Sequence, residues 1–193
     1  SGDWWVQSLA ASLPVKLAAM NFKGKTVLDV CCAPGGKSFQ MADMGAALTS
    51  IDKSEKRLKL MRESLARLNF DFELINVDVF DYKPKKMYDI ILLDPPCTAT
   101  GTIGKNPDLQ FLQPLEKLDE LMEIQQKMLE RCADWLIEGG AIIYSVCSLL
   151  KEEGEYQITK FLKNNNCFRA VGPKNGGYLK EDGFEVQKDK GIR

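Results

Sequence analysis

Two cysteines stand where covalent chemistry could take place. Cys97 and Cys147 each follow a run of apolar residues that is typical of a buried strand. A third such run, 26–30, opens into the glycine-containing loop 31–37. Because the carboxyl ends of parallel strands meet at one edge of a sheet, this pattern predicts a glycine loop and both thiols beside one ligand crevice. A thiol beside a bound cofactor is suited to nucleophilic attack on a substrate.

Carboxylates stand at the ends of the same runs. Asp52 and Asp78 end the second and third strand-like runs, and Asp94 closely precedes the first candidate thiol. A carboxylate at the position of Asp52 can bind a ribose diol, and Asp78 could meet a base edge. The loop 31–37 has neither the dinucleotide-fold spacing nor a P-loop ending, but its paired glycines let a ligand approach the backbone. An adenosine cofactor is therefore suggested, with turn capping by both aspartates as the alternative.

Composition excludes several kinds of chemistry. The chain has 193 residues, 45% of them apolar, and a net charge of −1, which indicates one globular domain without overall basic character. It contains no histidine, which excludes histidine bases, serine–histidine triads and histidine metal ligands. The six cysteines show no CxxC spacing and the chain shows no signal-peptide pattern. We therefore expect reduced thiols in a cytoplasmic protein with no metal and no membrane span.

Strand-like and helical patterns alternate along the chain. The expected strands lie near 26–31, 47–52, 72–77, 88–94 and 141–147. Their nearly continuous apolar runs are typical of strands that are buried on both faces. Ser54 is expected to cap a helix whose apolar face includes Leu58 and Met61. This alternation predicts a doubly wound α/β domain with a mostly parallel sheet.

Three further helices are expected. A long helix begins near Leu115 and should end at Gly139-Gly140, where the chain would turn into the next strand. Another helix should cover 152–164. The N-terminal stretch Trp4–Met20 also has helical spacing, with an interruption expected at Pro14.

Several motifs occur together and in one order over about residues 4 to 165. The motifs are Cys31-Cys32-Ala33-Pro34-Gly35-Gly36-Lys37, Asp52, Asp94-Pro95-Pro96-Cys97-Thr98-Ala99-Thr100-Gly101 and Ser145-Val146-Cys147-Ser148-Leu149. Taken together they resemble the motifs of RNA cytosine-5 methyltransferases of the Sun (Fmu) type. The resemblance implies a Rossmann-like class I methyltransferase fold, S-adenosylmethionine as cofactor, and carbon 5 of cytosine in RNA as the target. Ribosomal RNA is favoured over transfer RNA, and a monomer is expected.

The resemblance also implies roles for the cofactor-binding residues. Asp52 would bind the ribose hydroxyls, Asp78 would lie by the adenine, and Asp94 would face both cofactor and target base. Arg57 matches a basic residue that follows Asp52 in the family, although a helix-surface arginine explains it equally well. The methionine and ribose side of the cofactor would contact the residues of the loop, Cys31, Cys32, Ala33, Pro34, Gly35, Gly36 and Lys37.

The residues alone do not choose between the two thiols. Carbon 5 of cytosine becomes nucleophilic when a thiolate adds to carbon 6, and a second acid/base group must then help to release the product. The Pro-Cys motif of DNA cytosine methyltransferases would favour Cys97 as nucleophile. The later motif of the RNA family matches Cys147, with Val146 in place of the usual threonine. We therefore predict Cys147 as nucleophile, Cys97 as the group that assists release, and Asp94 as an acid beside the ring nitrogen.

The C-terminal part departs from the family pattern. Only Glu181-Asp182-Gly183-Phe184 resembles the family's closing signature, so the fold could lack its C-terminal strands. We expect a helical segment at 1–22 that packs on a methyltransferase catalytic domain at 23–193, shortened at its C-terminus. Two rival functions remain at this point. One is an amino-group methyltransferase with an Asp-Pro-Pro motif, and the other is an RNA-binding scaffold without catalysis.

Overall fold

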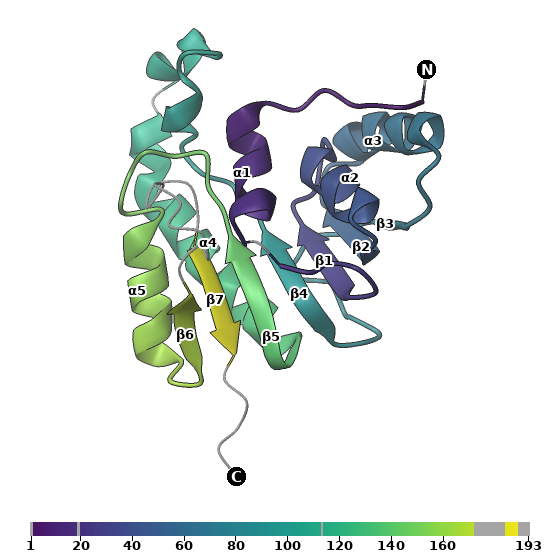
Figure 1. Cartoon of the computed structure of the whole chain (residues 1–193). Helices are drawn as coiled ribbons and strands as arrows, with labels where there is room; N and C mark the ends of the chain where they lie inside the picture. Colours follow the sequence, from purple (N-terminus) through teal and green to yellow (C-terminus); the bar gives the residue numbers. More distant parts are fainter. Residues whose placement is uncertain (1, 19, 113, 172–183, 189–193) are drawn as a thin grey trace.

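A twisted sheet forms the centre of the protein (Figure 1). The computed structural model describes residues 2–18, 20–112, 114–171 and 184–188. Within these residues the sheet has seven strands in the order β3-β2-β1-β4-β5-β7-β6. Strands β1 to β5 pair in parallel, whereas β7 is antiparallel to both neighbours. The strands are β1 (Thr26–Val30), β2 (Ala47–Asp52), β3 (Glu73–Asn76), β4 (Tyr88–Leu93), β5 (Leu136–Tyr144), β6 (Phe168–Val171) and β7 (Phe184–Lys188).

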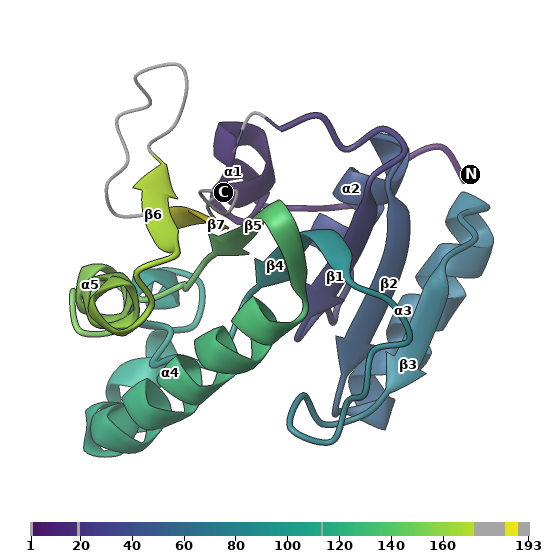
Figure 2. The ribbon, with the colours of Figure 1, turned by 90° about the horizontal axis from the view of Figure 1, so that it is seen from below.

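Helices cover both faces of the sheet (Figure 2). Helices α1, α2 and α3 lie on one face, and α4 and α5 lie on the other. The helices are α1 (Leu9–Ala18), α2 (Gly36–Asp43), α3 (Glu55–Leu68), α4 (Leu118–Asp134) and α5 (Glu155–Asn164), with short 3-10 turns η1 (Thr100–Thr102), η2 (Pro107–Gln110) and η3 (Pro114–Lys117). The predicted doubly wound α/β architecture is therefore confirmed.

Neighbouring residues of one strand serve opposite cores. In β1, Val27 packs in the cluster under α1 and α2, whereas Leu28 packs in the cluster under α4 and α5. In β4, Ile90 packs under α1 and α2, whereas Ile91 packs under α4 and α5. Successive side chains of a strand point to opposite faces, so a strand between two helix layers is apolar at most of its positions. This explains the continuous apolar runs of the sequence.

The predicted interruption at Pro14 is wrong. Helix α1 continues through Pro14 from Leu9 to Ala18. A proline inside a helix removes one backbone hydrogen bond. Here its ring is buried, and Val15 beside it is buried against the sheet, so packing holds the helix together. The helix begins later than expected, because Ser8 accepts a hydrogen bond from the backbone of Ala11 at its start.

The predicted role of Gly139-Gly140 is also wrong. Helix α4 ends at Asp134, and β5 begins at Leu136 and runs through both glycines. Gly139 has a φ of 76°, and the pairing of β4 with β5 shifts register between Tyr88 and Ile90. The glycines therefore form an irregularity within the strand, where a side chain would not fit the backbone conformation.

Two strands follow α5, a point that the sequence left open. Strand β6 pairs with β7, and β7 inserts between β5 and β6. The residues of β7, Phe-Glu-Val-Gln-Lys, alternate in polarity and lack the continuous apolar run by which the other strands were recognised. The predicted signature at 181–183 lies outside the described residues, and its Phe184 is the first residue of β7.

Candidate active site

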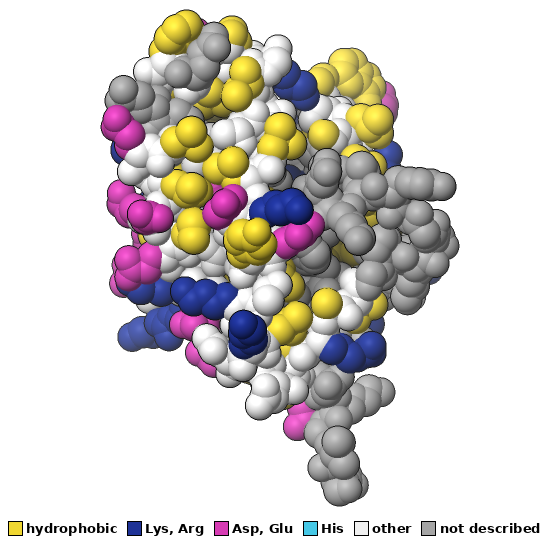
Figure 3. All heavy atoms as spheres, turned by 90° about the vertical axis from the view of Figure 1, so that its left-hand side faces the viewer, with side chains coloured by type: hydrophobic (Ala, Val, Ile, Leu, Met, Phe, Trp, Pro, Cys, Tyr) yellow, Lys and Arg dark blue, Asp and Glu magenta, His cyan; other side chains and the backbone are white. Residues whose placement is uncertain are grey.

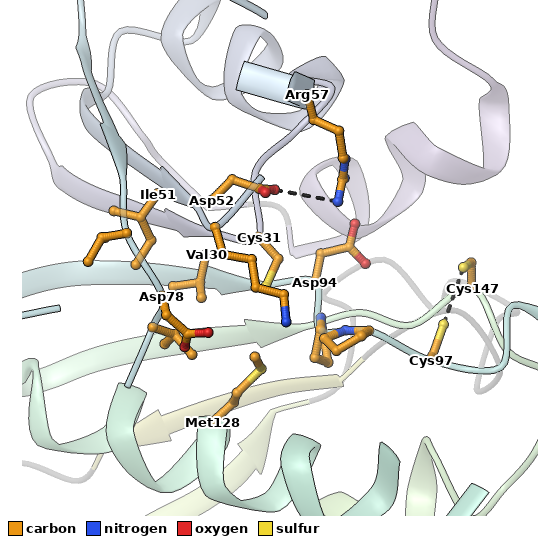
Figure 4. A pocket seen from close by; sticks show the side chains of 15 residues that line it. Val30, Cys31, Ile51, Asp52, Arg57, Asp78, Asp94, Cys97, Met128 and Cys147 are labelled. Carbon is orange, nitrogen blue, oxygen red and sulfur yellow. Dashed lines mark hydrogen bonds and ion pairs between the residues drawn. The ribbon is translucent and has the colours of Figure 1, made fainter. Parts of the chain in front are cut away.

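A cavity of about 240 Å³ opens at the carboxyl ends of β1, β2 and β4 (Figure 4). The strand order reverses between β1 and β4, which is where open α/β sheets bind their ligands. Asp52, Asp78 and Asp94 all line this cavity, and both candidate thiols lie at one end of it. The structure therefore brings together the carboxylates and thiols that the sequence predicted for one rim.

The loop after β1 packs tightly against the core and leads into helix α2. Gly35 has a φ of 105°, and a β-carbon there would lie 2.9 Å from side-chain atoms of Phe39 and Met61. Only glycine therefore fits this position. Helix α2 begins at Gly36, so its first backbone N–H groups face the loop, where they can bind an anionic or polar ligand. This arrangement suits the carboxylate end of an amino-acid-bearing cofactor.

Asp52 both caps a turn and faces the cavity. Its carboxylate accepts hydrogen bonds from the backbone of Ala33 (3.1 Å) and of Ser54 (2.8 Å). The Arg57 guanidinium lies 3.6 Å from Asp52 Oδ2. Ser54 caps α3 as predicted, because its hydroxyl accepts a hydrogen bond from the backbone of Arg57. Two loops thus hold a carboxylate at a strand end, where a ribose diol could bind.

A second carboxylate lines the opposite part of the cavity. Asp78 lies across the cavity from Asp52 and close to Met128 of α4 (Figure 4). Its side chain also accepts a hydrogen bond from the backbone of Phe80 at 3.0 Å, which fixes the turn after β3. Ile51 and Val79 supply apolar walls. An apolar slot with one carboxylate at its edge fits a purine base with an exocyclic amino group.

The two candidate thiols are in direct contact. Cys97 Sγ lies 3.3 Å from Cys147 Sγ, although the residues come from loops after different strands. The hydrogen bond between the sulfurs lowers the pKa of the Cys147 thiol. The same hydrogen bond, together with burial, raises the pKa of Cys97. Cys147 is therefore the thiol that ionises first, and a thiolate is the nucleophilic form of cysteine.

Asp94 has a cationic partner. The Lys37 ammonium donates a hydrogen bond to Asp94 Oδ2 at 2.7 Å, and both side chains are largely withdrawn from solvent. Lys37 comes from the first turn of α2 and Asp94 follows β4. Figure 4 shows Asp94 between Asp52 and the two thiols. The sequence identified both residues but did not predict that they form an ion pair.

A buried carboxylate lies beneath the loop and was missed. Asp29 belongs to β1, is 1% exposed, and is hydrogen-bonded to Ser38 of α2. Burial raises its pKa from the ordinary value of 3.8 to about 7, although the hydrogen bond from Ser38 opposes this change. Asp29 also lines a second cavity of about 460 Å³ together with Trp5 and Lys37. An aspartate inside an apolar strand run was the signal that could have revealed it.

Two tryptophans and a further cysteine lie outside the cavity lined by the thiols. Trp5 packs edge-on against Phe39 and Phe70, with ring centroids 6.1 and 6.2 Å apart, and is a partly buried residue at the edge of the core. Trp4 is 61% exposed. Cys132 of α4 is fully buried in the core.

The fold and the site together define the class. The parallel sheet with its antiparallel β7, the glycine loop after β1 and the acidic strand ends form a Rossmann-like class I methyltransferase domain. The chain belongs to the 16S rRNA methyltransferase RsmB/F family, whose family model matches residues 17–183. The resemblance drawn from the motifs is confirmed.

Individual relatives support this assignment. The Ribosomal RNA small subunit methyltransferase B of Shewanella oneidensis is 36% identical over 162 residues, which cover 81% of this chain and 38% of the relative. A methyltransferase homolog protein from Pyrococcus horikoshii superposes with a TM-score of 0.73 at 27% identity, over 95% of this chain and 68% of that chain. NSun6 from Pyrococcus horikoshii, solved with SFG, shares the fold with a TM-score of 0.79 at 24% identity, over 98% and 53% of the two chains.

The chain spans 38% of the length of the Shewanella relative, so it corresponds to only part of that protein. In the described part of the chain, no group of three or more Cys, Asp and Glu residues is placed to hold a metal ion. No helix among the described residues combines the length and apolar character that crossing a membrane requires.

Proposed function

We propose that this chain carries the catalytic site of an S-adenosylmethionine-dependent RNA cytosine-5 methyltransferase that acts on ribosomal RNA. The single observation that carries the proposal is the pair of sulfurs 3.3 Å apart at the end of the cofactor cavity. Membership of the RsmB/F family supports the choice of substrate. When bound, S-adenosylmethionine supplies an electrophilic methyl group.

The cavity would hold the cofactor through residues of three strand ends. Asp52 would bind the ribose hydroxyls, and Asp78 the base edge. Arg57 would act through Asp52, to which it is paired. The loop from Cys31 to Lys37 would hold the methionine part: Cys31, Cys32, Ala33, Pro34, Gly35, Gly36 and Lys37. The start of α2 at Gly36 supports this placement, because the first N–H groups of a helix can bind a carboxylate.

Cys147 is the nucleophile in this proposal. Its thiolate adds to carbon 6 of the cytosine, which moves electron density to carbon 5 so that carbon 5 can accept the methyl group. The lowered pKa of Cys147 supports this choice over Cys97. The Lys37 ammonium, which is paired with Asp94, supplies a proton through Asp94 to the ring nitrogen of the adduct, and the pair takes this proton back when Cys147 leaves.

Cys97 then takes part in release. The hydrogen bond to Cys147 is the first cause of its raised pKa. That cause disappears once the Cys147 sulfur is bonded to carbon, so Cys97 can lose its proton to solvent. The resulting thiolate takes the proton from carbon 5. The double bond between carbons 5 and 6 re-forms, and Cys147 leaves as a thiolate.

The surface suggests where RNA would bind. The face formed by α4 and α5 mixes acidic and basic side chains (Figure 3). Its acidic groups Asp119, Glu123 and Glu130 stand among the lysines Lys127 and Lys160, so this face does not offer phosphates a uniformly basic surface. We therefore place the RNA at the edge that carries the thiols. We further propose a monomeric, cytoplasmic protein, and light scattering after size-exclusion chromatography tests the first point.

The rival functions are not favoured. An amino-group methyltransferase would have an aromatic residue at the position of Cys97, and it would not need Cys147. A silent scaffold would not need two thiols in contact.

A covalent trap tests the proposal. The protein is incubated with S-adenosylmethionine and a ribosomal RNA fragment that contains 5-fluorocytosine, from which no proton can be removed at carbon 5. A protein–RNA adduct that survives a denaturing gel is expected. Methyl transfer to unmodified RNA without any adduct in the trap would contradict the thiol mechanism.

A further inference from the structure

A buried glutamate lies beneath the two thiol loops and has no role in the chemistry above. Glu153 is 0% exposed and lies between β5 and α5. A carboxylate withdrawn from water is tolerated only where donors satisfy its oxygens. The partners of Glu153 therefore indicate what it holds in place.

Those partners surround Cys97. Glu153 accepts hydrogen bonds from the backbone N–H of Thr98 (2.9 Å) and from its hydroxyl (2.5 Å). The amide of Gln125 donates to Glu153 at 2.9 Å and to the carbonyl of Pro96 at 2.9 Å. Thr98, which follows Cys97, is therefore hydrogen-bonded directly to the carboxylate of Glu153. Pro96, which precedes Cys97, is linked to the same carboxylate through the side chain of Gln125.

The same network reaches the loop of Cys147. Thr98 Oγ1 and Ser148 Oγ are 3.1 Å apart, and Ser148 directly follows Cys147. The carbonyl of Cys147 accepts a hydrogen bond from the backbone of Gly101 at 3.0 Å. Tyr144, at the end of β5, donates its hydroxyl to the carbonyl of Glu153 at 2.8 Å. The carboxylate thus joins two loops that come from different strands.

We infer that Glu153 is a positioning residue that holds the sulfurs of Cys97 and Cys147 in contact. It does so by fixing Thr98, which is bonded to the loops of both thiols. The inference rests on the proposed function only in assigning catalytic roles to Cys97 and Cys147. The contact itself is a property of the protein without substrate.

The physical consequence concerns the ionisation of Cys147. Truncation of Glu153 leaves the buried N–H of Thr98 without its acceptor, and the loop must move to find another. A hydrogen bond between sulfurs weakens steeply with separation. The pKa of Cys147 should then rise, because the bond to Cys97 is the first cause of its low value.

The experiment measures the pH profile of alkylation at Cys147 by iodoacetamide, resolved by peptide mass spectrometry. Glu153→Ala should slow alkylation at neutral pH by about tenfold, since one net hydrogen bond corresponds to about one pKa unit. Glu153→Gln should stay close to the unmodified protein. Its amide can donate to the Thr98 hydroxyl, which can in turn donate to Ser148. Glu152→Ala removes the neighbouring acid as a control and should leave the profile unchanged.

Circular dichroism establishes which variants are folded. A folded Glu153→Ala variant with an unchanged profile overturns the inference. If that variant does not fold, Thr98→Val replaces it, because this change removes only the hydroxyl link between Glu153 and Ser148. A slowing of about threefold is then expected, and no change overturns the inference. Alkylation needs neither RNA nor cofactor, so failure of the covalent trap would contradict the proposed function and leave this result standing.

Discussion

Asp29 should make the protein less stable as the pH rises through the weakly acidic range. Its carboxyl is fully buried in β1, and burial raises its pKa from 3.8 to about 7. In the unfolded chain it ionises near the ordinary value. Between these pKa values the folded protein binds one more proton than the unfolded chain. The stability contributed by Asp29 is therefore complete below about pH 4, falls as the pH approaches 7, and is constant above that.

The size of the effect follows from the two pKa values. The interval from 3.8 to about 7, at about 1.36 kcal/mol per pKa unit, corresponds to about 4 kcal/mol. Asp29→Asn keeps the shape of the side chain and an acceptor for Ser38, but it does not titrate. The free energy of unfolding of the variant, relative to the unmodified protein, should rise by about 4 kcal/mol between pH 4 and pH 7.5. Urea unfolding at a series of pH values measures it.

A second aspartate provides the control. Asp89 of β4 is paired with Lys25 at 2.9 Å and accepts hydrogen bonds from Thr26. Partial burial raises its pKa, but the hydrogen bonds from Thr26 and Lys25 together outweigh burial, so its pKa is lowered. The stability from Asp89 is therefore complete above the ordinary pKa of 3.8 and is lost only as the pH falls below it. Asp89→Asn should thus show no slope relative to the unmodified protein between pH 4 and pH 7.5, and a slope of opposite sign below about pH 4. Parallel stability curves for Asp29→Asn and the unmodified protein between pH 4 and pH 7 would refute the reasoning.

Three further predictions follow from the site. Gly35→Ala should lower the free energy of unfolding by about 1 to 3 kcal/mol, because of the φ of 105° and the 2.9 Å approach; urea unfolding measures it, and an unchanged midpoint would contradict the loop geometry. Asp52→Ala should weaken S-adenosylmethionine binding at least tenfold in calorimetry, through loss of the ribose contacts and of the turn that its carboxylate holds; equal binding would remove Asp52 from the cofactor site. Cys147→Ala should abolish both methyl transfer and adduct formation, whereas Cys97→Ala should permit methylation and accumulate an adduct on denaturing gels; the reverse pattern would make Cys97 the nucleophile.

Much of the site could be predicted from the sequence. The glycine loop, Asp52, Asp94 and both thiols were identified because they follow apolar runs, and parallel strands bring such positions to one edge. The helix cap at Ser54 could also be predicted from the sequence, because it depends only on neighbouring residues. Each of these features depends on local pattern and on the topology of one common fold.

Other local signals were misleading. The sequence predicted that Pro14 interrupts a helix and that Gly139 ends one. In the structure, helix α1 runs through Pro14, and Gly139 lies inside strand β5. Packing against the sheet compensates for the hydrogen bond lost at the proline, and pairing with β4 accommodates the glycine irregularity. Propensity predicts what a segment prefers in isolation, and tertiary contacts can outweigh that preference.

The difference in acidity between the two thiols arises only from the tertiary structure. In the sequence Cys97 and Cys147 are fifty residues apart and chemically equivalent. Their contact at 3.3 Å makes one thiol more acidic and the other less so, and the network of Glu153 joins their loops. The sequence therefore determined which groups reach the edge of the sheet, whereas the tertiary structure decided which of them touch. Ionisation depends on distances of a few ångströms and on exclusion of water, and neither is encoded in the spacing of residues along the chain.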